Sequence, residues 1–237
     1  MKIWAHRGAS GYAPENTLEA FALAVEMGAD GVELDVQMCR DGYLVVAHDE
    51  RIDRVSNGTG FVRDYTLREL KRFFFNRTHP EYADARIPTL QEVYELLKGT
   101  GLCINVELKT GIYFYNGLEE RVLELTKRMG MEERVIYSSF NHYSVKKIKA
   151  LRPDAQTGIL YSDGIFSVAS YAESIGADAL HPAIYNLQYP ELAEQARERG
   201  LKIHVWTVNT EEQRDMCLDA GADAVISNFP DKMRNPR

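Results

Sequence analysis

The sequence predicts a closed (β/α)8 barrel, the TIM-barrel fold. Strand-like and helix-like segments alternate along the chain, and the alternation supplies eight βα units. The length of 237 residues also suits a barrel, which typically has about 250. A doubly wound open sheet is the alternative, but about six strands usually suffice for that architecture. We expect a single domain over residues 1–237.

The first unit begins with the apolar strand KIWAH and continues into a helix over residues 17–27. Apolar residues recur at helical spacing along one face of that helix: Leu18, Phe21, Ala22 and Val25. Asn16 is a good N-cap residue for the helix, and Glu19 follows it three positions later. The second strand is then GVELDV, residues 31–36.

The later units repeat this alternation. The expected helices are residues 90–98, 118–129, 143–151, 165–175, 190–199 and 211–220. The expected strands are residues 103–108, 135–140, 156–161, 179–184, 202–208 and 224–229. Thr89 and Glu92 form a capping box for the first of these helices. Gly-Ala-Asp recurs before three of the strands, where the glycine can end the preceding helix.

One segment breaks the alternation and predicts an insertion. After the second strand the chain reads QMCRDGYLVVAHD, in which Asp41-Gly42 is a hairpin signal between two apolar runs. We expect the second strand to pass the barrel rim, turn, and return through YLVVAH. Residues 49–88 then form a small excursion on the rim rather than a separate core-bearing domain. The FFF run at 73–75 is its expected apolar seam.

Composition and charge narrow the classes of function. The chain is 45% hydrophobic and 27% charged, as in soluble globular proteins, and no apolar run approaches the roughly 20 residues of a membrane span. A net charge of −7 disfavours nucleic-acid binding, which needs a basic face. Three cysteines without a C-x-x-C pair favour reduced thiols and a cytoplasmic location. The sequence leaves a homo-oligomer open.

Carboxylates gather at the expected carboxyl ends of the barrel strands, where barrel active sites lie. Residues i and i+2 of a strand point the same way, so Glu33 and Asp35 face one side together. Glu107 and Lys109 repeat this spacing on the next barrel strand. Three converging carboxylates would raise one another's pKa unless a cation lay between them. Such an all-oxygen site suits one divalent cation, Mg²⁺ or Ca²⁺.

Two histidines and two cationic side chains complete the expected site. His6 and Arg7 end the first strand, and the returning hairpin is expected to bring His48 back beside Glu33. With Lys109 and a metal, these residues suit phosphoryl chemistry, because the metal and Arg7 neutralise charge on the non-bridging oxygens. One histidine can take a proton from the nucleophile while the other protonates the leaving alcohol.

These residues resemble a known family, the glycerophosphodiester phosphodiesterases. The resemblance runs over most of the chain and is densest in residues 3–61, with AHRGASGYAPENTLEAF, GADGVELDVQ and DGYLVVAHDE. NVELK, SSF and VWTVN then follow in the family's order. The resemblance implies a barrel with the inserted segment after the HD pair. It also implies hydrolysis of glycerophosphodiesters to sn-glycerol 3-phosphate and an alcohol.

The resemblance further implies roles for individual residues. It makes His6 and His48 the acid and base, Glu33, Asp35 and Glu107 the metal ligands, Arg7 and Lys109 the phosphate-binding residues, and Trp206 an apolar wall beside the glycerol. Asn16 and Glu15 keep simpler interpretations, as a helix cap and as a first-turn charge favoured by the helix dipole. Cys39 stands where family members often have Thr, and the eighth helix is expected to be at most a stub.

Two other functions stay open. One is a barrel that only binds a phosphate ligand; such a degenerate copy should have lost a histidine or a carboxylate, whereas this sequence retains them all. The other is a related phosphodiesterase of the lysophospholipase D type, for which an apolar groove at the rim would take an acyl chain.

Overall fold

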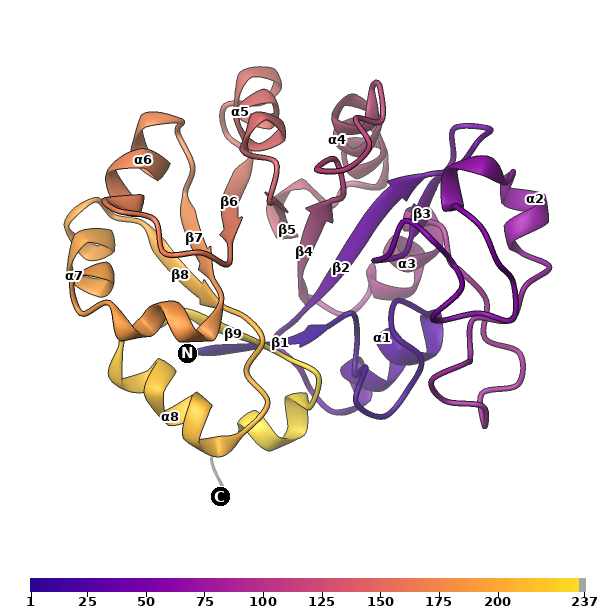
Figure 1. Cartoon of the computed structure of the whole chain (residues 1–237), viewed down its shortest axis with the longest axis horizontal. Helices are drawn as coiled ribbons and strands as arrows, with labels where there is room; N and C mark the ends of the chain where they lie inside the picture. Colours follow the sequence, from indigo (N-terminus) through magenta and orange to yellow (C-terminus); the bar gives the residue numbers. More distant parts are fainter. Residues whose placement is uncertain (235–237) are drawn as a thin grey trace.

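The structure is a computed structural model that describes residues 1–234, and it contains the expected closed barrel (Figure 1). β1 pairs in parallel with β2 on one side and with β9 on the other, which closes the sheet. The parallel strands are β1 (Lys2–His6), β2 (Gly31–Met38), β4 (Cys103–Leu108), β5 (Val135–Ser139), β6 (Gln156–Tyr161), β7 (Ala179–Pro182), β8 (Lys202–Val205) and β9 (Ala224–Ser227). The predicted (β/α)8 fold is confirmed.

Helices cover the outside of the barrel. They are α1 (Leu18–Glu26), α3 (Leu90–Leu97), α4 (Leu118–Met129), α5 (His142–Leu151), α6 (Val168–Ser174), α7 (Glu191–Glu198) and α8 (Glu211–Asp219). After β9 the described chain forms a short 3-10 helix, Pro230–Met233, so the eighth helix is the expected stub. No helix described within residues 1–234 combines the length and the apolar character needed to cross a bilayer.

Helix starts follow local capping chemistry, with one correction. The capping box of Thr89 and Glu92 at the start of α3 is confirmed. The N-cap of α1, however, is Thr17, whose side chain accepts from the N–H of Ala20. The interpretation of Asn16 as the helix cap is therefore wrong, because Asn16 lies one residue earlier and its side chain is turned into the barrel mouth.

The strands pack outward against the helices, as alternation along each strand predicts. Val32, Leu34 and Val36 of β2 belong to an apolar cluster that includes Phe21 of α1 and Val93 of α3. The opposite face of the strands lines the barrel interior. A small apolar cluster lies inside the barrel, formed by Trp4, Ala224 and Ile226 with Cys103, Ile136 and Trp206 packed against it. The polar residues above that cluster form the candidate site.

The hairpin extension of β2 is confirmed. β3 (Leu44–Val46) pairs antiparallel with the end of β2, and Gly42 takes a left-handed φ of 83° in the turn between them. In this register the N–H of Ala47 donates to the carbonyl of Asp35. His48 follows this hairpin and acts electrostatically on Asp35 and on Glu107. Its expected place beside Glu33 stays a prediction.

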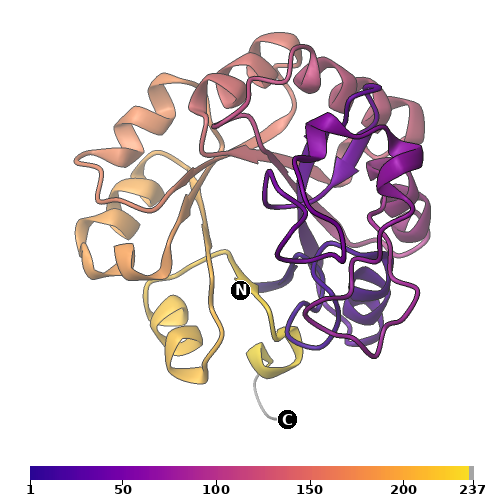
Figure 2. The same cartoon turned by 45° about the vertical axis from the view of Figure 1, so that its right-hand side comes forward.

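The excursion of residues 49–88 lies over the rim beside α1, and Figure 2 shows it in purple on that side of the barrel. It contains the short helix α2 (Leu67–Leu70) and a 3-10 turn, Val62–Asp64. Unexpectedly, it encloses a small apolar cluster shared with the hairpin: Cys39, Val45, Ala47, Ile52, Val62, Leu70, Phe75 and Ile87. Two residues of the FFF run form the seam: Phe75 is buried and Phe73 packs against the cluster, whereas the half-buried Phe74 lies under the guanidinium of Arg86.

Candidate active site

Three buried carboxylates meet at the carboxyl end of the barrel. Glu33 and Asp35 come from β2 and Glu107 from β4, and one oxygen from each lies within 4.8 Å of the others. The strands explain this convergence, because β2 and β4 are neighbours and Asp35 stands directly opposite Glu107 in the register. All three side chains are almost completely buried. The spacing in the sequence predicted this cluster correctly.

The carboxylates differ in their electrostatic surroundings. Burial raises the pKa of Asp35, but Arg7 and Lys109 outweigh that effect and hold its pKa well below the usual range. Burial, together with repulsion from Asp35 and Glu107, raises the pKa of Glu33 well above its ordinary value. Burial also raises the pKa of Glu107, although Lys109 opposes the shift. The cluster therefore attracts a proton or a cation.

One oxygen of the cluster is free to bind a cation. Asp35 Oδ2 accepts a hydrogen bond from Asn16, whereas Asp35 Oδ1 is buried without a hydrogen-bond partner among residues 1–234. A buried carboxylate oxygen normally has such a partner, and a hard divalent ion prefers oxygen ligands. The donor set of Glu33, Asp35 and Glu107 therefore fits one hard cation.

Two cationic side chains border the carboxylates. Lys109 follows β4, and its Nζ lies 3.0 Å from Glu107 Oε1 and 3.8 Å from Asp35 Oδ1. Arg7 follows β1 with a left-handed φ of 56°, which turns the chain over the mouth of the barrel. Its backbone N–H donates to Glu33 Oε2 at 3.0 Å, and its Nε lies 3.4 Å from Asp35 Oδ2. Both cations lie where the sequence placed them.

His6 is held at the end of β1 by a residue from the last strand. Its Nδ1 lies 2.6 Å from Oδ1 of Asn228, and its Nε2 lies 3.9 Å from Glu33 Oε2. Because an amide oxygen can only accept, Nδ1 carries the proton and Nε2 carries the lone pair. Burial and the charge of Arg7 lower the pKa of His6 to about 4. The imidazole is therefore neutral near pH 7.

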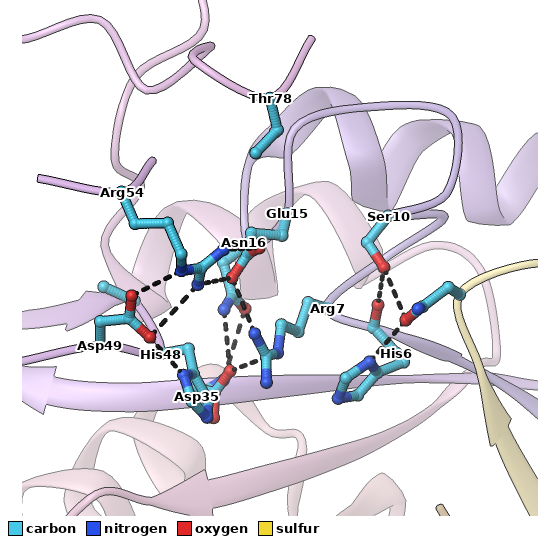
Figure 3. Close-up of polar contacts among 12 residues, drawn as sticks. His6, Arg7, Ser10, Glu15, Asn16, Asp35, His48, Asp49, Arg54 and Thr78 are labelled. Atoms are coloured by element: carbon cyan, nitrogen blue, oxygen red, sulfur yellow. Dashed lines mark hydrogen bonds and ion pairs between the residues drawn. The ribbon is translucent and has the colours of Figure 1, made fainter. Parts of the chain in front are cut away.

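His48 follows β3 and is oriented by its own neighbour in the sequence. Its Nδ1 lies 2.6 Å from Asp49 Oδ1, and Figure 3 shows the ring beside Asp35 at the mouth of the barrel. A carboxylate is an acceptor, so Nδ1 of His48 donates the hydrogen bond, and Nε2 is the nitrogen left to exchange a proton with a substrate. His6 and His48 are thus both anchored through Nδ1, which leaves Nε2 of each ring as the nitrogen that can accept or donate a proton.

Sequence reasoning missed two amides that position the site. Asn16 donates from Nδ2 to Asp35 Oδ2 at 2.8 Å, and Asn228 holds the ring of His6. The hydroxyl of Ser10 donates to Oδ1 of Asn228 as well (Figure 3). For Asn228 a signal existed, because it directly follows the last barrel strand. For Asn16 the signal was its residue type, since Asn tolerates a left-handed backbone better than most residues.

Trp206 lies at the mouth of the barrel, just past the end of β8, whereas the sequence predicted it inside that strand. β8 ends at Val205, and the half-buried indole of Trp206 donates from Nε1 to the carbonyl of His181 at 2.8 Å. Its ring meets that of Phe140 edge-on, with centroids 5.5 Å apart. The strand order places β8 across the barrel from β4, the strand that carries Glu107.

Comparisons with known proteins agree with this geometry. The model of the glycerophosphoryl diester phosphodiesterase family matches residues 6–232. A glycerophosphodiester phosphodiesterase of Caldanaerobacter subterraneus is 44% identical over 234 residues, which cover 98% of this chain and 96% of the relative. One of Bacillus subtilis is 35% identical, over 96% of this chain and 83% of the relative.

The solved structures include close folds. An Oleispira antarctica phosphodiesterase in complex with the product sn-glycerol-3-phosphate has a TM-score of 0.92 and 30% identity, over 98% of this chain and 95% of its own. A glycerophosphodiester phosphodiesterase of Thermotoga maritima has a TM-score of 0.81 and 30% identity, over 98% and 96%. With its barrel, its carboxylate cluster and these matches, the chain belongs to the glycerophosphoryl diester phosphodiesterase family.

Proposed function

We propose that the chain hydrolyses glycerophosphodiesters to sn-glycerol 3-phosphate and an alcohol, using one divalent cation and two histidines. The observation that carries the proposal is the meeting of three buried carboxylates with His6 and His48 at one barrel mouth. The Oleispira antarctica relative, solved with sn-glycerol-3-phosphate, supports the same substrate class. The completeness of the site argues against a barrel that only binds phosphate.

Glu33, Asp35 and Glu107 would hold the cation. Asp35 Oδ1, which has no hydrogen-bond partner within residues 1–234, and the raised pKa of Glu33 and of Glu107 support this assignment. Both Mg²⁺ and Ca²⁺ accept such oxygen ligands. When bound there, the ion supplies positive charge beside the non-bridging phosphate oxygens.

The remaining residues act on the substrate directly. The planar guanidinium of Arg7 binds phosphate oxygens, and Lys109 adds a second positive charge. One of His6 and His48 accepts a proton at Nε2 from the nucleophile, and the other delivers a proton to the leaving alcohol oxygen. Trp206 offers an apolar face to the glycerol carbons. In this assignment Lys109 pairs with Glu107 and also contacts the phosphate, and the two roles do not exclude each other.

Acyl-bearing substrates are a second candidate, favoured by the rim. Phe114, Phe140 and Phe166 follow β4, β5 and β6 and are exposed by 78%, 44% and 95%. Phe140 also contacts Trp206. An acyl chain attached to the glycerol could leave the site along Trp206 and Phe140 and cover this apolar rim. The chain would then act on lysophospholipids as well, in the manner of a lysophospholipase D.

A panel of glycerophosphodiesters with identification of both products tests the proposal. Glycerophosphocholine, glycerophosphoethanolamine and lysophosphatidylcholine are incubated with the protein, before and after exhaustive chelation. We expect sn-glycerol 3-phosphate from the first two, loss of turnover with chelator, and recovery with Mg²⁺ or Ca²⁺. Glu33→Gln should be inactive at near-normal stability. Full turnover after chelation would contradict the cation assignment, and turnover of lysophosphatidylcholine alone would favour the second candidate.

We infer that barrel and excursion form one domain, because the apolar cluster of the excursion includes Val45 and Ala47 of the hairpin. All three cysteines have free thiols, and Cys39 and Cys217 are buried. Reduced thiols are consistent with the proposed cytoplasmic location.

A further inference from the structure

We propose that Arg54, contributed by the excursion, is a positioning residue that couples the two sides of the catalytic site. It orients His48 through Asp49 and orients Arg7 through Glu15. This inference rests on the proposed function, since it gives Arg54 a role in the same phosphodiester hydrolysis. Figure 3 shows the guanidinium of Arg54 between the two carboxylates.

Arg54 contacts Asp49, the residue that orients His48. Arg54 Nε donates to Asp49 Oδ2 at 2.7 Å, and Arg54 Nη2 donates to Asp49 Oδ1 at 3.2 Å. Asp49 Oδ1 is also the acceptor for Nδ1 of His48 at 2.6 Å. These two hydrogen bonds from one guanidinium fix the plane of the Asp49 carboxylate. The fixed carboxylate in turn fixes the tautomer and the ring orientation of His48.

Arg54 also contacts Glu15, the residue that orients Arg7. Arg54 Nη1 and Nη2 donate to Glu15 Oε2 and Oε1, each at 2.7 Å. Glu15 Oε1 also accepts from Arg7 Nη1 at 2.8 Å. The guanidinium groups of Arg54 and Arg7 therefore bind the same carboxylate, that of Glu15. A continuous chain of hydrogen bonds runs from His48 through Asp49, Arg54 and Glu15 to Arg7.

Charge balance explains why the linking residue is cationic. Glu15 and Asp49 both face Arg54, and its hydrogen bonds to Glu15 and Asp49 raise its own pKa. Without that charge, both oxygens of Glu15 would compete for the guanidinium of Arg7, which the substrate phosphate also needs. Asp49 would lose its second partner and could swing away from His48. Removal of Arg54 should therefore disturb both ends of the site together.

The excursion fixes the backbone of Arg54. Ile52, two residues earlier, is buried in the apolar cluster of the excursion, and its carbonyl accepts from the N–H and the hydroxyl of Ser56. The carbonyl of Asp53 accepts from Arg77 Nη1 at 2.7 Å. Arg54 therefore projects from a turn whose backbone is held by hydrogen bonds and by the buried side chain of Ile52. The small core of the excursion thus gives Arg54 the rigidity that a positioning residue needs.

The experiment compares Arg54→Ala with Arg51→Ala. Arg51 is a matched control from the same turn: it pairs with Asp53 and lies over Phe61, and within residues 1–234 it makes no hydrogen bond or ion pair to a residue of the site. We expect Arg54→Ala to lower kcat on glycerophosphocholine by about 10–100-fold, as removal of outer-shell partners typically does, and Arg51→Ala to leave it unchanged. The double variant with Asp49→Ala should lose little more than Arg54→Ala alone, because Asp49 acts through His48, which Arg54→Ala already disturbs.

A spectroscopic readout separates this inference from the proposed function. Nitrogen NMR of ring-labelled histidine reports which nitrogen of His48 carries the proton, whether or not the chain turns over substrate. We expect Nδ1 of His48 to carry a proton in the wild type and in Arg51→Ala, and to carry it only part of the time in Arg54→Ala. Wild-type kcat and an unchanged His48 signal in Arg54→Ala would overturn the inference.

A conservative variant covers the case in which Arg54→Ala does not fold. Lysine keeps the charge but cannot make two bidentate pairs at once, so Arg54→Lys should show a partial loss of kcat and a partial change of the His48 signal. A lysine variant with wild-type kcat and a wild-type signal would overturn the inference equally. If the wild type does not cleave any glycerophosphodiester, the proposed function fails while the NMR comparison still decides the role of Arg54.

Discussion

Asn16 controls the orientation of Asp35 from a backbone conformation that few residues adopt. Its φ is 59°, which an Asn tolerates because its short polar side chain can bond locally. Its Nδ2 holds Asp35 Oδ2 at 2.8 Å, and its own N–H donates to the carbonyl of Arg7. Asp35 Oδ1 is thereby the oxygen left without a hydrogen-bond partner among residues 1–234. One amide thus selects which oxygen is offered to a cation.

Removing that amide should weaken cation binding. Glycine keeps the left-handed backbone, so Asn16→Gly removes the side chain with little added strain. We expect its affinity for Mg²⁺ or Ca²⁺, measured by isothermal titration calorimetry, to fall by about 10–100-fold. Asn16→Ala should lose the same affinity and also some stability, because alanine is strained at positive φ. Wild-type cation affinity in Asn16→Gly would contradict this account.

Single residues were predictable where strand geometry alone decides their direction. Glu33, Asp35 and Glu107 follow from the alternation along two neighbouring strands. Asn16 and Asn228 did not follow, because their contacts cross 19 and 222 residues of sequence through loops. Local pattern carries no information about which loop will cross the barrel mouth.

At the scale of elements, β6 shows how one strand makes room for its neighbour. Gly158 faces the barrel interior, and a Cβ built on it would collide with Nε2 of His181 on β7. His181 in turn lies 2.9 Å from Nδ1 of His204 on β8. A glycine in the middle of a strand usually weakens it, so this position is kept small for the imidazole beside it.

Gly158→Ala should therefore destabilise the barrel. Overpacking of a closed interior typically costs about 1–3 kcal/mol. Gly99→Ala is the matched control, because nothing lies within 4 Å of a Cβ at Gly99 and its backbone is not left-handed. We expect the control to change the free energy of unfolding by less than about 1 kcal/mol. Urea unfolding of both variants checks this, and equal stabilities would show that His181 can move aside.

The types of the elements were predictable, but several ends were not. The strand expected at 202–208 ends at Val205, and the helix expected at 165–175 begins at Val168. The extra residues at both places include apolar residues of the βα loops: Phe166 is exposed and Trp206 is half-buried, whereas Val208 is buried in the core although it lies outside the strand. The apolar pattern continues past the ends of these elements, so a prediction from hydrophobicity extends them.

For the whole molecule, the histidine pair inside the barrel links stability to pH. Burial lowers the pKa of His204 to about 4 and that of His181 well below 6.5. In the unfolded chain both imidazoles titrate near 6.5. Between these values the unfolded state binds more protons, so the free energy of unfolding decreases as pH falls. The slope is about 1.4 kcal/mol per pH unit for each imidazole that stays neutral in the fold.

His204→Gln should flatten that dependence. Urea unfolding between pH 7 and pH 5 gives the slope for wild type and variant. We expect the variant slope to be smaller by about one proton, whatever its absolute stability. The difference between the two slopes isolates His204 from the carboxylates and from His6, which titrate in both proteins. Identical slopes would mean that His204 is protonated inside the barrel.

The global architecture was predictable because eight βα units leave few alternatives, whereas the packing of the excursion was not. Its cluster joins Cys39 and Val45 of the hairpin to Leu70 and Ile87, which are far apart in the sequence and show no regular period. Without a period, apolar residues in a loop do not reveal what they pack against.

The closure of the barrel has a consequence for how the chain is made. Lys2 and Trp4 pair with Ala224 and Ile226, so the first strand needs the last one as a partner. During synthesis β1 can pair with β2 early, but its other edge stays open until β9 has emerged. Such late, long-range pairing slows folding and leaves strand edges exposed to other chains. A translation product that stops before residue 224 would therefore be prone to aggregate.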